Sequence, residues 1–177
     1  MSAGTTSESP DTAPAWVAFC PRCASPMRTR YVVDKPRRAC PACGYVYFTD
    51  PKVGVGVAVL DDGKLLLVRR ARNPERGKWS LPAGFVDQGE DPGVAAAREA
   101  LEETGLVVAI DSVIDVYFNP PDQGSASIFI LYRATRIEGE PVAGDDADAA
   151  GFFGLDQLPE LAFSSTRAAV AQLLHGQ

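Results

Sequence analysis

The sequence contains very little histidine, and this limits the catalytic sites that it can form. Its 177 residues include one histidine, His175, close to the C-terminal end. Residues near a chain end are usually poorly ordered, so a Ser-His-Asp or Cys-His catalytic site is not expected. Any catalysis would therefore depend on carboxylates or on a bound metal ion.

Long apolar runs and targeting signals are also lacking. The apolar stretches are shorter than the roughly 20 residues that a transmembrane helix needs. Residues 1–15 have neither the basic start nor the apolar core of a signal peptide. We therefore expect no membrane partner and a cytoplasmic location, where thiols stay reduced.

The sequence has no excess of positive charge. With 17 basic and 23 acidic side chains, its net charge is −6, so the molecule as a whole should be repelled by nucleic acid. The charge is unevenly divided, because residues 16–50 carry a net +4 and residues 51–177 a net −8. We expect a disordered tail over residues 1–15, a small basic module over 16–50 and an acidic globular domain over 51–177.

Four cysteines lie in the basic module as two Cys-x-x-Cys pairs. The first motif is formed by Cys20 and Cys23 and the second by Cys40 and Cys43, and sixteen residues separate the two motifs. Four thiolates at this spacing can complete a tetrahedral zinc site, which would stabilise a segment too short to bury its own core. Residues 45–49 then have the pattern of a strand, so the module resembles a zinc ribbon. We predict a structural zinc ion, because four cysteine ligands leave no coordination position open; a redox dithiol is less favoured.

The basic module also has side chains that could contact nucleic acid. These are Arg28, Arg30, Lys35, Arg37 and Arg38. Few aromatic residues alternate with them, and the rest of the protein is acidic. Nucleic acid is therefore not the expected partner.

The acidic domain begins with the pattern of a β-hairpin. Two apolar runs, residues 53–60 and 64–70, flank the sequence Asp-Asp-Gly at 61–63. Aspartate and glycine tolerate the backbone conformations that a tight turn requires. The two runs are therefore predicted to pair as antiparallel strands.

A helix is predicted further along the domain. Asp91 is a typical N-cap, Pro92 suits the first helical position, and Gly105 suits the position just after the last turn. The face expected to pack on the core consists of Val94, Ala97, Leu101 and Thr104.

Three glutamates on this helix are arranged unfavourably for stability. Glu99, Glu102 and Glu103 are spaced i, i+3 and i+4. Like charges at this spacing cost about 0.2–0.5 kcal/mol per pair, and the helix dipole adds about 0.3–1 kcal/mol. Arg98 can offset part of this cost by pairing with Glu102. A bound divalent cation would offset more, because Mg²⁺ prefers oxygen ligands such as carboxylates.

The segment around the helix resembles the signature of the Nudix hydrolases. Its fixed positions are Gly84, Glu90 and the run Arg98-Glu99-Ala100-Leu101-Glu102-Glu103-Thr104-Gly105-Leu106. The spacing matches as well, with five residues after the glycine and seven after the first glutamate. The resemblance implies an α+β fold, an α/β/α sandwich, preceded here by the small N-terminal zinc ribbon.

The resemblance also implies roles for the matching residues. Glu99, Glu102 and Glu103 would bind Mg²⁺ or Mn²⁺, and Glu99 and Glu103 are the candidates for the catalytic base within the signature. Glu90 and Arg98 would form a supporting ion pair. Structural support of the signature falls to Gly84, Glu90, Arg98 and Gly105.

A ribbon joined to a Nudix domain is similar to two groups, the NADH pyrophosphatases and the ADP-ribose/FAD pyrophosphatases. The Ser-Gln-Pro-Trp run typical of the first group is missing, whereas residues 161–165 resemble the C-terminal segment of the second. The resemblance implies hydrolysis of ADP-ribose, FAD or a similar dinucleotide, with AMP as one product. The alternatives are an NADH pyrophosphatase, an enzyme that removes a nucleotide cap from RNA, and a non-catalytic nucleotide-sensing regulator. Nudix domains and ribbons often pair, so a homodimer is expected.

Further residues are candidates for contacts with the substrate or the attacking water. The aromatic candidates are Trp79, Phe85, Tyr117 and Phe118. The arginine candidates are Arg69, Arg70, Arg72 and Arg76. Asp146 and Asp148 are candidates for a catalytic base outside the signature. Aromatic residues in strands are more often part of the core and surface arginines are usually solvated, so none of these is assigned a role.

Overall fold

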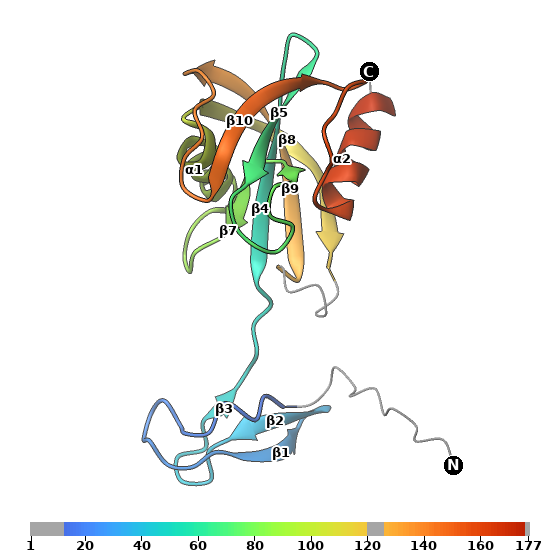
Figure 1. The fold of residues 1–177 in the computed structure, drawn as a ribbon. Coiled ribbons are helices and arrows are strands. Elements are labelled where there is room, and N and C mark those ends of the chain that lie inside the picture. The colour runs from blue at the N-terminus through green and yellow to red at the C-terminus, as the bar shows by residue number, and fades with distance from the viewer. Residues whose placement is uncertain (1–12, 120–125, 176–177) are drawn as a thin grey trace, which may run out of the picture. The chain divides into compact units, whose positions relative to one another are not determined.

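The computed structural model describes residues 13–119 and 126–175 (Figure 1). Most of the predicted tail therefore lies outside the described residues. The chain folds as two compact units, Met1–Asp50 and Pro51–Gln177, here called the N-terminal and the C-terminal unit. None of the described helices has both the length and the apolar character that crossing a membrane requires.

The N-terminal unit is a small antiparallel sheet beside the cysteines. Its strands pair in the order β1 (Arg28–Val32), β2 (Lys35–Ala39) and β3 (Val46–Tyr47). The strand predicted over residues 45–49 is thus shorter than expected. The buried core of the unit consists of Val17, Cys20, Met27 and Cys40. A core of four residues buries too little apolar surface to stabilise an isolated fold. The unit therefore needs a covalent or metal crosslink.

The predicted hairpin of the C-terminal unit is confirmed. β4 (Val53–Asp61) and β5 (Lys64–Arg70) are antiparallel neighbours. Between them, Asp62 and Gly63 have φ angles of 48° and 72°. A two-residue turn with both residues in the left-handed region matches the twist of the flanking strands.

A mixed sheet forms the centre of the C-terminal unit. Over the described residues its strands lie in the order β10, β5, β4, β9 and β8, while β6 pairs with β5 and β7 with β4. β4 and β9 are parallel, whereas β8 and β9 are antiparallel. These strands are β6 (Trp79–Ser80), β7 (Ala83–Phe85), β8 (Val107–Phe118), β9 (Ile128–Glu138) and β10 (Ala147–Gly154).

Two helices cover opposite faces of this sheet (Figure 1). They are α1 (Pro92–Thr104) and α2 (Ser164–His175). Successive residues of a strand point to opposite faces. Accordingly, Val57 of β4 lies in one buried cluster with Ala96 of α1, and the adjacent Ala58 lies in a second cluster with Val170 of α2. The predicted α/β/α sandwich is confirmed.

α1 begins and ends where the sequence predicts. The Asp91 side chain accepts hydrogen bonds from the backbone N–H groups of Gly93 at 2.8 Å and Val94 at 3.2 Å. At the other end, Gly105 has a φ of 69° and donates its N–H to the carbonyl oxygen of Leu101. Both ends of the helix are therefore fixed by local capping.

The predicted packing face of α1 is confirmed at Thr104 and Ala97 but wrong at Val94 and Leu101. Val94 and Leu101 are 62% and 49% exposed. The residues that face inward are Ala95, Ala96, Glu99, Ala100, Glu103 and Thr104. The small alanines let the helix approach the sheet closely, and this carries two carboxylates into the interior. Carboxylates on a buried helix face break the hydrophobic pattern, as is expected at a functional site.

Gly105→Ala should lower the free energy of unfolding of the C-terminal unit by about 1–2 kcal/mol, because a left-handed conformation costs a residue with a Cβ about that much. The nearest atoms to the added methyl group would be 3.8 Å away, so no clash contributes. Urea denaturation measures the difference. In Gly151→Ala, a control without a positive φ, the added methyl group would be 3.7 Å from Phe153. Equal stability of Gly105→Ala and the wild type would contradict the prediction.

Candidate functional site

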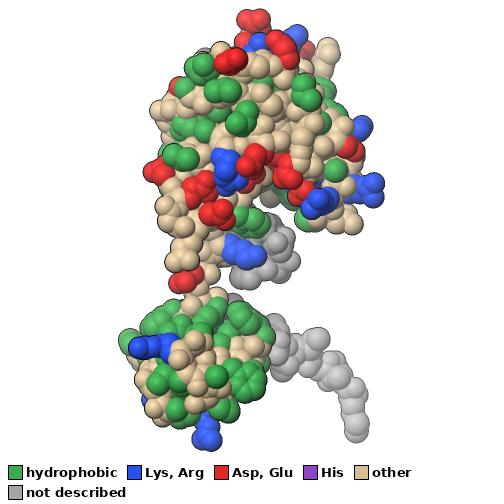
Figure 2. Space-filling model, turned by 90° about the vertical axis from the view of Figure 1, so that its left-hand side faces the viewer, with side chains coloured by type: hydrophobic (Ala, Val, Ile, Leu, Met, Phe, Trp, Pro, Cys, Tyr) green, Lys and Arg blue, Asp and Glu red, His purple; other side chains and the backbone are tan. Residues whose placement is uncertain are grey.

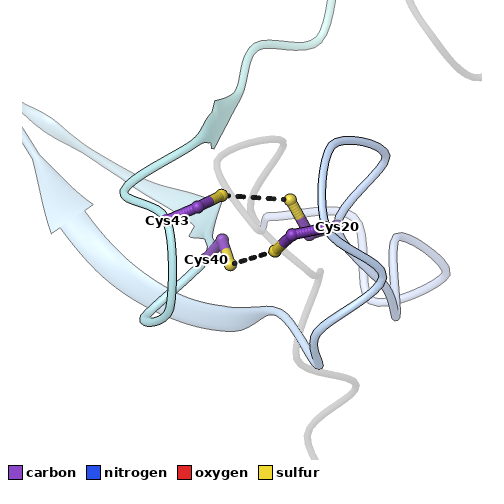
Figure 3. A group of neighbouring side chains, drawn as sticks. Cys20, Cys40 and Cys43 are labelled. Atoms are coloured by element: carbon purple, nitrogen blue, oxygen red, sulfur yellow. Dashed lines mark hydrogen bonds between the residues drawn. The ribbon is translucent and has the colours of Figure 1, made fainter.

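The four cysteines of the N-terminal unit come together (Figure 3). The Sγ atoms of Cys20 and Cys43 are 3.6 Å apart, and those of Cys23 and Cys40 are 3.5 Å apart. All four sulfurs lie within 4.8 Å of one another. These separations exceed a disulfide bond of about 2.05 Å, and the cysteines are free.

The arrangement of the sulfurs fits a tetrahedral metal site. With Zn–S bonds of about 2.3 Å, tetrahedral geometry puts neighbouring sulfurs about 3.8 Å apart. The observed separations of 3.5 and 3.6 Å, with none above 4.8 Å, bracket that value. The four cysteines could therefore hold a metal ion without rearrangement of the backbone.

Arg38, a candidate for contacting nucleic acid, is engaged inside the N-terminal unit. Its guanidinium donates to the carbonyl oxygens of Val17 at 3.0 Å and Met27 at 2.8 Å, and to the Thr29 hydroxyl at 3.1 Å. Three of its five N–H donors are therefore used inside the unit. The face of this unit seen in Figure 2 shows mainly hydrophobic side chains, whereas acidic and basic side chains gather next to each other on the C-terminal unit.

In the C-terminal unit, the glutamates of α1 differ in burial. Glu99 and Glu103 are 9% and 8% exposed, whereas Glu102 is exposed. Glu99 and Glu103 are one helical turn apart, so they share the face that packs toward β7. Of the three glutamates on α1, two therefore face inward and one faces solvent.

Gly84 in β7 leaves room for the carboxylate of Glu99. A Cβ atom at residue 84 would lie 2.0 Å from both Cδ and Oε1 of Glu99. The adjacent Ala83 donates its backbone N–H to Oε2 of Glu103 at 3.0 Å. Both inward-facing carboxylates are therefore held against the backbone of Ala83 and Gly84, and a Cβ at residue 84 would displace the Glu99 carboxylate.

Arg98 links the loop before α1 to the glutamates. Its Nε and Nη2 atoms donate to the two carboxylate oxygens of Glu90 at 2.9 and 3.0 Å. Its Nη1 atom donates to Glu99 at 2.8 Å and to Glu102 at 3.0 Å, and Nη2 also donates to the carbonyl oxygen of Phe85 at 3.1 Å. One guanidinium therefore contacts three carboxylates, offsets part of their charge and braces the loop against the helix.

The carboxyl groups have shifted pKa values in opposite directions. Burial raises the pKa of Glu103 to about 7, although the N–H of Ala83 opposes the shift. Burial also raises the pKa of Glu99, against the effect of Arg98. Hydrogen bonds from Arg98 lower the pKa of Glu90 to about 2. Negative charge on Glu99 and Glu103 is therefore costly, and a bound cation would reduce that cost.

The three glutamates do not converge on one point. Among the residues that the structure describes, the cysteines are the one group in which three or more metal-ligating side chains come together. Arg98 lies between Glu99 and Glu102, and Glu103 accepts from Ala83. A cation shared by all three would have to replace contacts of Arg98.

The two aspartates considered as bases outside the signature are bound in ion pairs. Asp148 accepts from Arg69 at 2.6 Å, and Asp146 pairs with Arg72 at 3.0 Å. The first pair joins β10 to β5. The second joins the residue before β10 to the segment after β5, so two of the candidate arginines, Arg69 and Arg72, are bound in ion pairs.

Asp145 is a residue that the sequence did not single out. Its charge contributes to the raised pKa values of Glu99 and Glu103, so it lies near both carboxylates. The preceding Gly144 donates its N–H to the carbonyl oxygen of Glu103 at 3.1 Å, which holds this loop on the end of α1. The close approach depends on glycine, because a Cβ there would lie 2.4 Å from the carbonyl oxygen of Glu102.

A cavity of about 320 Å³ lies next to these carboxylates. Residues lining it include Arg70, Ser80, Leu81, Ala83, Phe129 and Thr166. Ala83 connects the cavity to the site, because it lines the wall and hydrogen-bonds Glu103. Of the candidate arginines, Arg70 lines this cavity. Ser80 and Thr166 carry no recognisable motif, and sequence reasoning missed them.

The candidate aromatic residues divide between core and surface. Trp79 packs edge-on against Phe153, with ring centroids 4.7 Å apart. Tyr117 packs against the buried cluster between the sheet and α2. Phe85 and Phe118 are 48% and 74% exposed. Trp79 therefore has a packing role.

Comparison with known proteins identifies the family. The family description "NUDIX domain" matches residues 50–174. The chain belongs to the Nudix family. A Nudix hydrolase from Nitrosomonas europaea has a crystal structure that superposes with a TM-score of 0.81 at 33% identity, over 90% of this chain and 93% of that one. The predicted family and fold are confirmed.

Two curated relatives indicate the range of activities in similar Nudix proteins. The ADP-ribose pyrophosphatase of Methanocaldococcus jannaschii is 42% identical over 120 residues, which cover 67% of this chain and 71% of that protein. The NAD-capped RNA hydrolase NudC of Chromobacterium violaceum is 33% identical over 146 residues, or 81% of this chain. The aligned part is 52% of that protein, so this chain spans about half its length. Family and relatives support the predicted class, a Nudix pyrophosphohydrolase.

Proposed function

We propose that the C-terminal unit hydrolyses nucleoside diphosphates linked to a second group and releases a nucleoside monophosphate. The observation that carries the proposal is the packing of the Glu99 and Glu103 carboxylates against the backbone of Ala83 and Gly84. Burial of two carboxylates is costly for folding alone, and it is explained by a cation and an anionic substrate. ADP-ribose and FAD are the first substrates to test, since a 42% identical relative is an ADP-ribose pyrophosphatase.

Glu99, Glu102 and Glu103 would hold Mg²⁺ or Mn²⁺ in this proposal. When bound, the cation neutralises the diphosphate and lowers the pKa of an attacking water molecule. The chain's own residues hold the carboxylates in place, through Arg98 on one side and Ala83 on the other. Glu99 and Glu103 are the candidates to accept a proton from the water.

The four cysteines would bind a structural zinc ion. Four thiolate ligands close the coordination sphere, so this ion would take no part in hydrolysis. A thiolate site also suits a compartment that keeps thiols reduced, in agreement with the expected cytoplasmic location. The expected homodimer stays a prediction, which sedimentation of the full chain would test.

Incubation of the full chain with Mg²⁺ and ADP-ribose, FAD or NADH should release AMP, and Glu103→Gln should lower kcat/KM by at least about 100-fold, equivalent to about 2.7 kcal/mol. Glutamine keeps an oxygen that can accept the Ala83 N–H, so the variant removes charge with little change of shape. Glu138→Gln, an exposed position in β9, is the matched control. A panel without turnover, or full activity in Glu103→Gln, would exclude the proposal.

Removal of a nucleotide cap from RNA is the second candidate function, and the similarity to NudC favours it. In that case, part of the N-terminal unit would bind the RNA chain. Competition of unmodified RNA with ADP-ribose hydrolysis, growing stronger as salt is lowered, would support this function. A nucleotide-sensing regulator would instead bind DNA in a ligand-dependent manner without turnover.

A further inference from the structure

One face of the sheet in the N-terminal unit carries a cluster of arginines. In the antiparallel pair of β1 and β2, Arg30 lies directly opposite Arg37, and residues opposite each other point to the same face. Arg28 lies two positions before Arg30 in β1 and therefore points to that face as well. These three residues are here called the arginine face. Lys35, two positions before Arg37 in β2, lies on the same side.

This arrangement is unfavourable for the unit by itself. Like charges directly opposite each other in a sheet are destabilising. Neither Arg28 nor Arg30 forms an ion pair with another described residue. Arg37 pairs with Asp34 at 3.8 Å, a long contact to an exposed side chain, and its buried Nε atom has no hydrogen-bond partner in the part of the chain that the structure describes. The arginine face therefore lacks anions that would offset its charge.

An exposed aromatic ring lies beside these charges. The guanidinium of Arg37 is 4.7 Å from the centroid of the Phe48 ring. Phe48 follows β3 directly and is 53% exposed. Proteins that bind single-stranded nucleic acid combine cations, which contact the phosphates, with aromatic rings on which bases stack. The planar guanidinium of arginine is also better suited than lysine to bind a phosphate through two hydrogen bonds.

The acidity of the whole chain does not prevent an anion from binding to this face. Residues 16–50 carry a net charge of +4, although the chain carries −6. At physiological ionic strength, charges more than about 8 Å away in solvent are largely screened. An acidic protein surface would pair with the arginines but would not explain the exposed ring beside them. The charges and the ring together therefore favour a single strand of nucleic acid.

We propose that the arginine face and Phe48 bind single-stranded nucleic acid, with the arginines on phosphate groups and a base stacked on the ring. The inference goes beyond the proposed hydrolysis, because this binding does not depend on turnover by the C-terminal unit. It also identifies the part of the N-terminal unit that would hold the RNA chain in the second candidate function. The sequence did not predict this partner, because the ring and the arginines come together only when the three strands pair.

Fluorescence anisotropy of a labelled oligouridylate of about 12 nucleotides, titrated with the full, zinc-loaded chain without Mg²⁺, tests the proposal. Arg30→Gln should weaken binding about fivefold to tenfold at low salt and reduce the slope of log K against log salt by about 0.7, as for one lost phosphate contact. Phe48→Leu should weaken binding at least about fivefold without changing the slope, because it removes stacking but no charge. Arg22→Gln, at an exposed position in the turn between Cys20 and Cys23, is the control with the same loss of charge and should bind like the wild type. Unchanged zinc content shows that each variant is folded.

Wild-type affinity in both Arg30→Gln and Phe48→Leu overturns the proposal. An equal loss in Arg30→Gln and Arg22→Gln also overturns it, because the net charge of the unit would then decide binding. A changed sedimentation of Arg30→Gln with unchanged RNA affinity overturns it as well, because the face would then be a contact between copies of the chain. Tighter binding of the single strand than of a duplex of the same length supports the proposal, since a duplex does not offer its bases to Phe48. None of these measurements requires hydrolysis, so they separate this inference from the proposed function.

Discussion

Gly84→Ala should lower kcat/KM for the preferred substrate by at least about 100-fold in a protein that remains folded. The added Cβ would lie 2.0 Å from the Glu99 carboxylate, so the carboxylate or β7 must move by an ångström or more. A displacement of about 1 Å in a catalytic constellation can cost about 100-fold in rate. The loss should appear in kcat and in the concentration of Mg²⁺ needed for half-maximal activity, because Glu99 is a proposed cation ligand. Steady-state kinetics across a Mg²⁺ series measures both.

Gly151→Ala is the matched control for this prediction. It makes the same chemical change in β10, where the new methyl group would meet Phe153 at an ordinary distance of 3.7 Å. Its activity and melting temperature should stay close to those of the wild type. If Gly84→Ala retained full activity and an unchanged Mg²⁺ requirement, the contact between residue 84 and Glu99 would have no part in the reaction.

Cys40→Ser should abolish binding of the proposed zinc ion and unfold the N-terminal unit. Structural zinc contributes about 10–16 kcal/mol of apparent binding free energy in zinc-finger peptides. The buried core of this unit is two cysteines with Val17 and Met27, so it cannot replace that contribution. The C-terminal unit has its own buried clusters on both faces of its sheet and should keep its thermal transition. Elemental analysis for zinc and amide hydrogen exchange of residues 13–50 measure the two effects.

Ala42→Ser controls for the presence of a serine in the same Cys-x-x-Cys turn. Residue 42 is exposed, so this variant should keep one zinc ion per chain and the protection of the unit. Retention of zinc and of slow exchange in Cys40→Ser would show that the four sulfurs do not hold a stabilising ion.

Much of this molecule is specified by local sequence. The turn at Asp62 and Gly63 and the caps of α1 at Asp91 and Gly105 depend on backbone preferences of those residues, and each lies where it was predicted. The cysteine spacing predicted a tight group of four thiols, because each pair is closed by its own turn. The family signature is likewise contiguous, so the family and sandwich fold could be inferred before any contact was known.

The arrangement of the glutamates depended on contacts between distant segments. The packing face of α1 was mispredicted, because hydrophobicity placed Val94 and Leu101 inside, whereas β7 receives Glu99 and Glu103. The pattern of hydrophobic residues in α1 could not predict this, because it carries no information about Gly84 in the partner strand β7, which leaves room for the Glu99 carboxylate.

The cavity, like the arrangement of the glutamates, depends on segments that are far apart in the sequence. Ser80 and Thr166 are 86 positions apart in the numbering, and each is unremarkable in its own segment. They share a cavity because β6 and α2 meet there in the folded unit. The sequence by itself determined the hairpin of β4 and β5, the ends of α1, the grouping of the cysteines and the family. Tertiary structure alone decided which carboxylates are buried against β7 and which residues share the cavity, because burial is a property of segments that meet only when the chain folds.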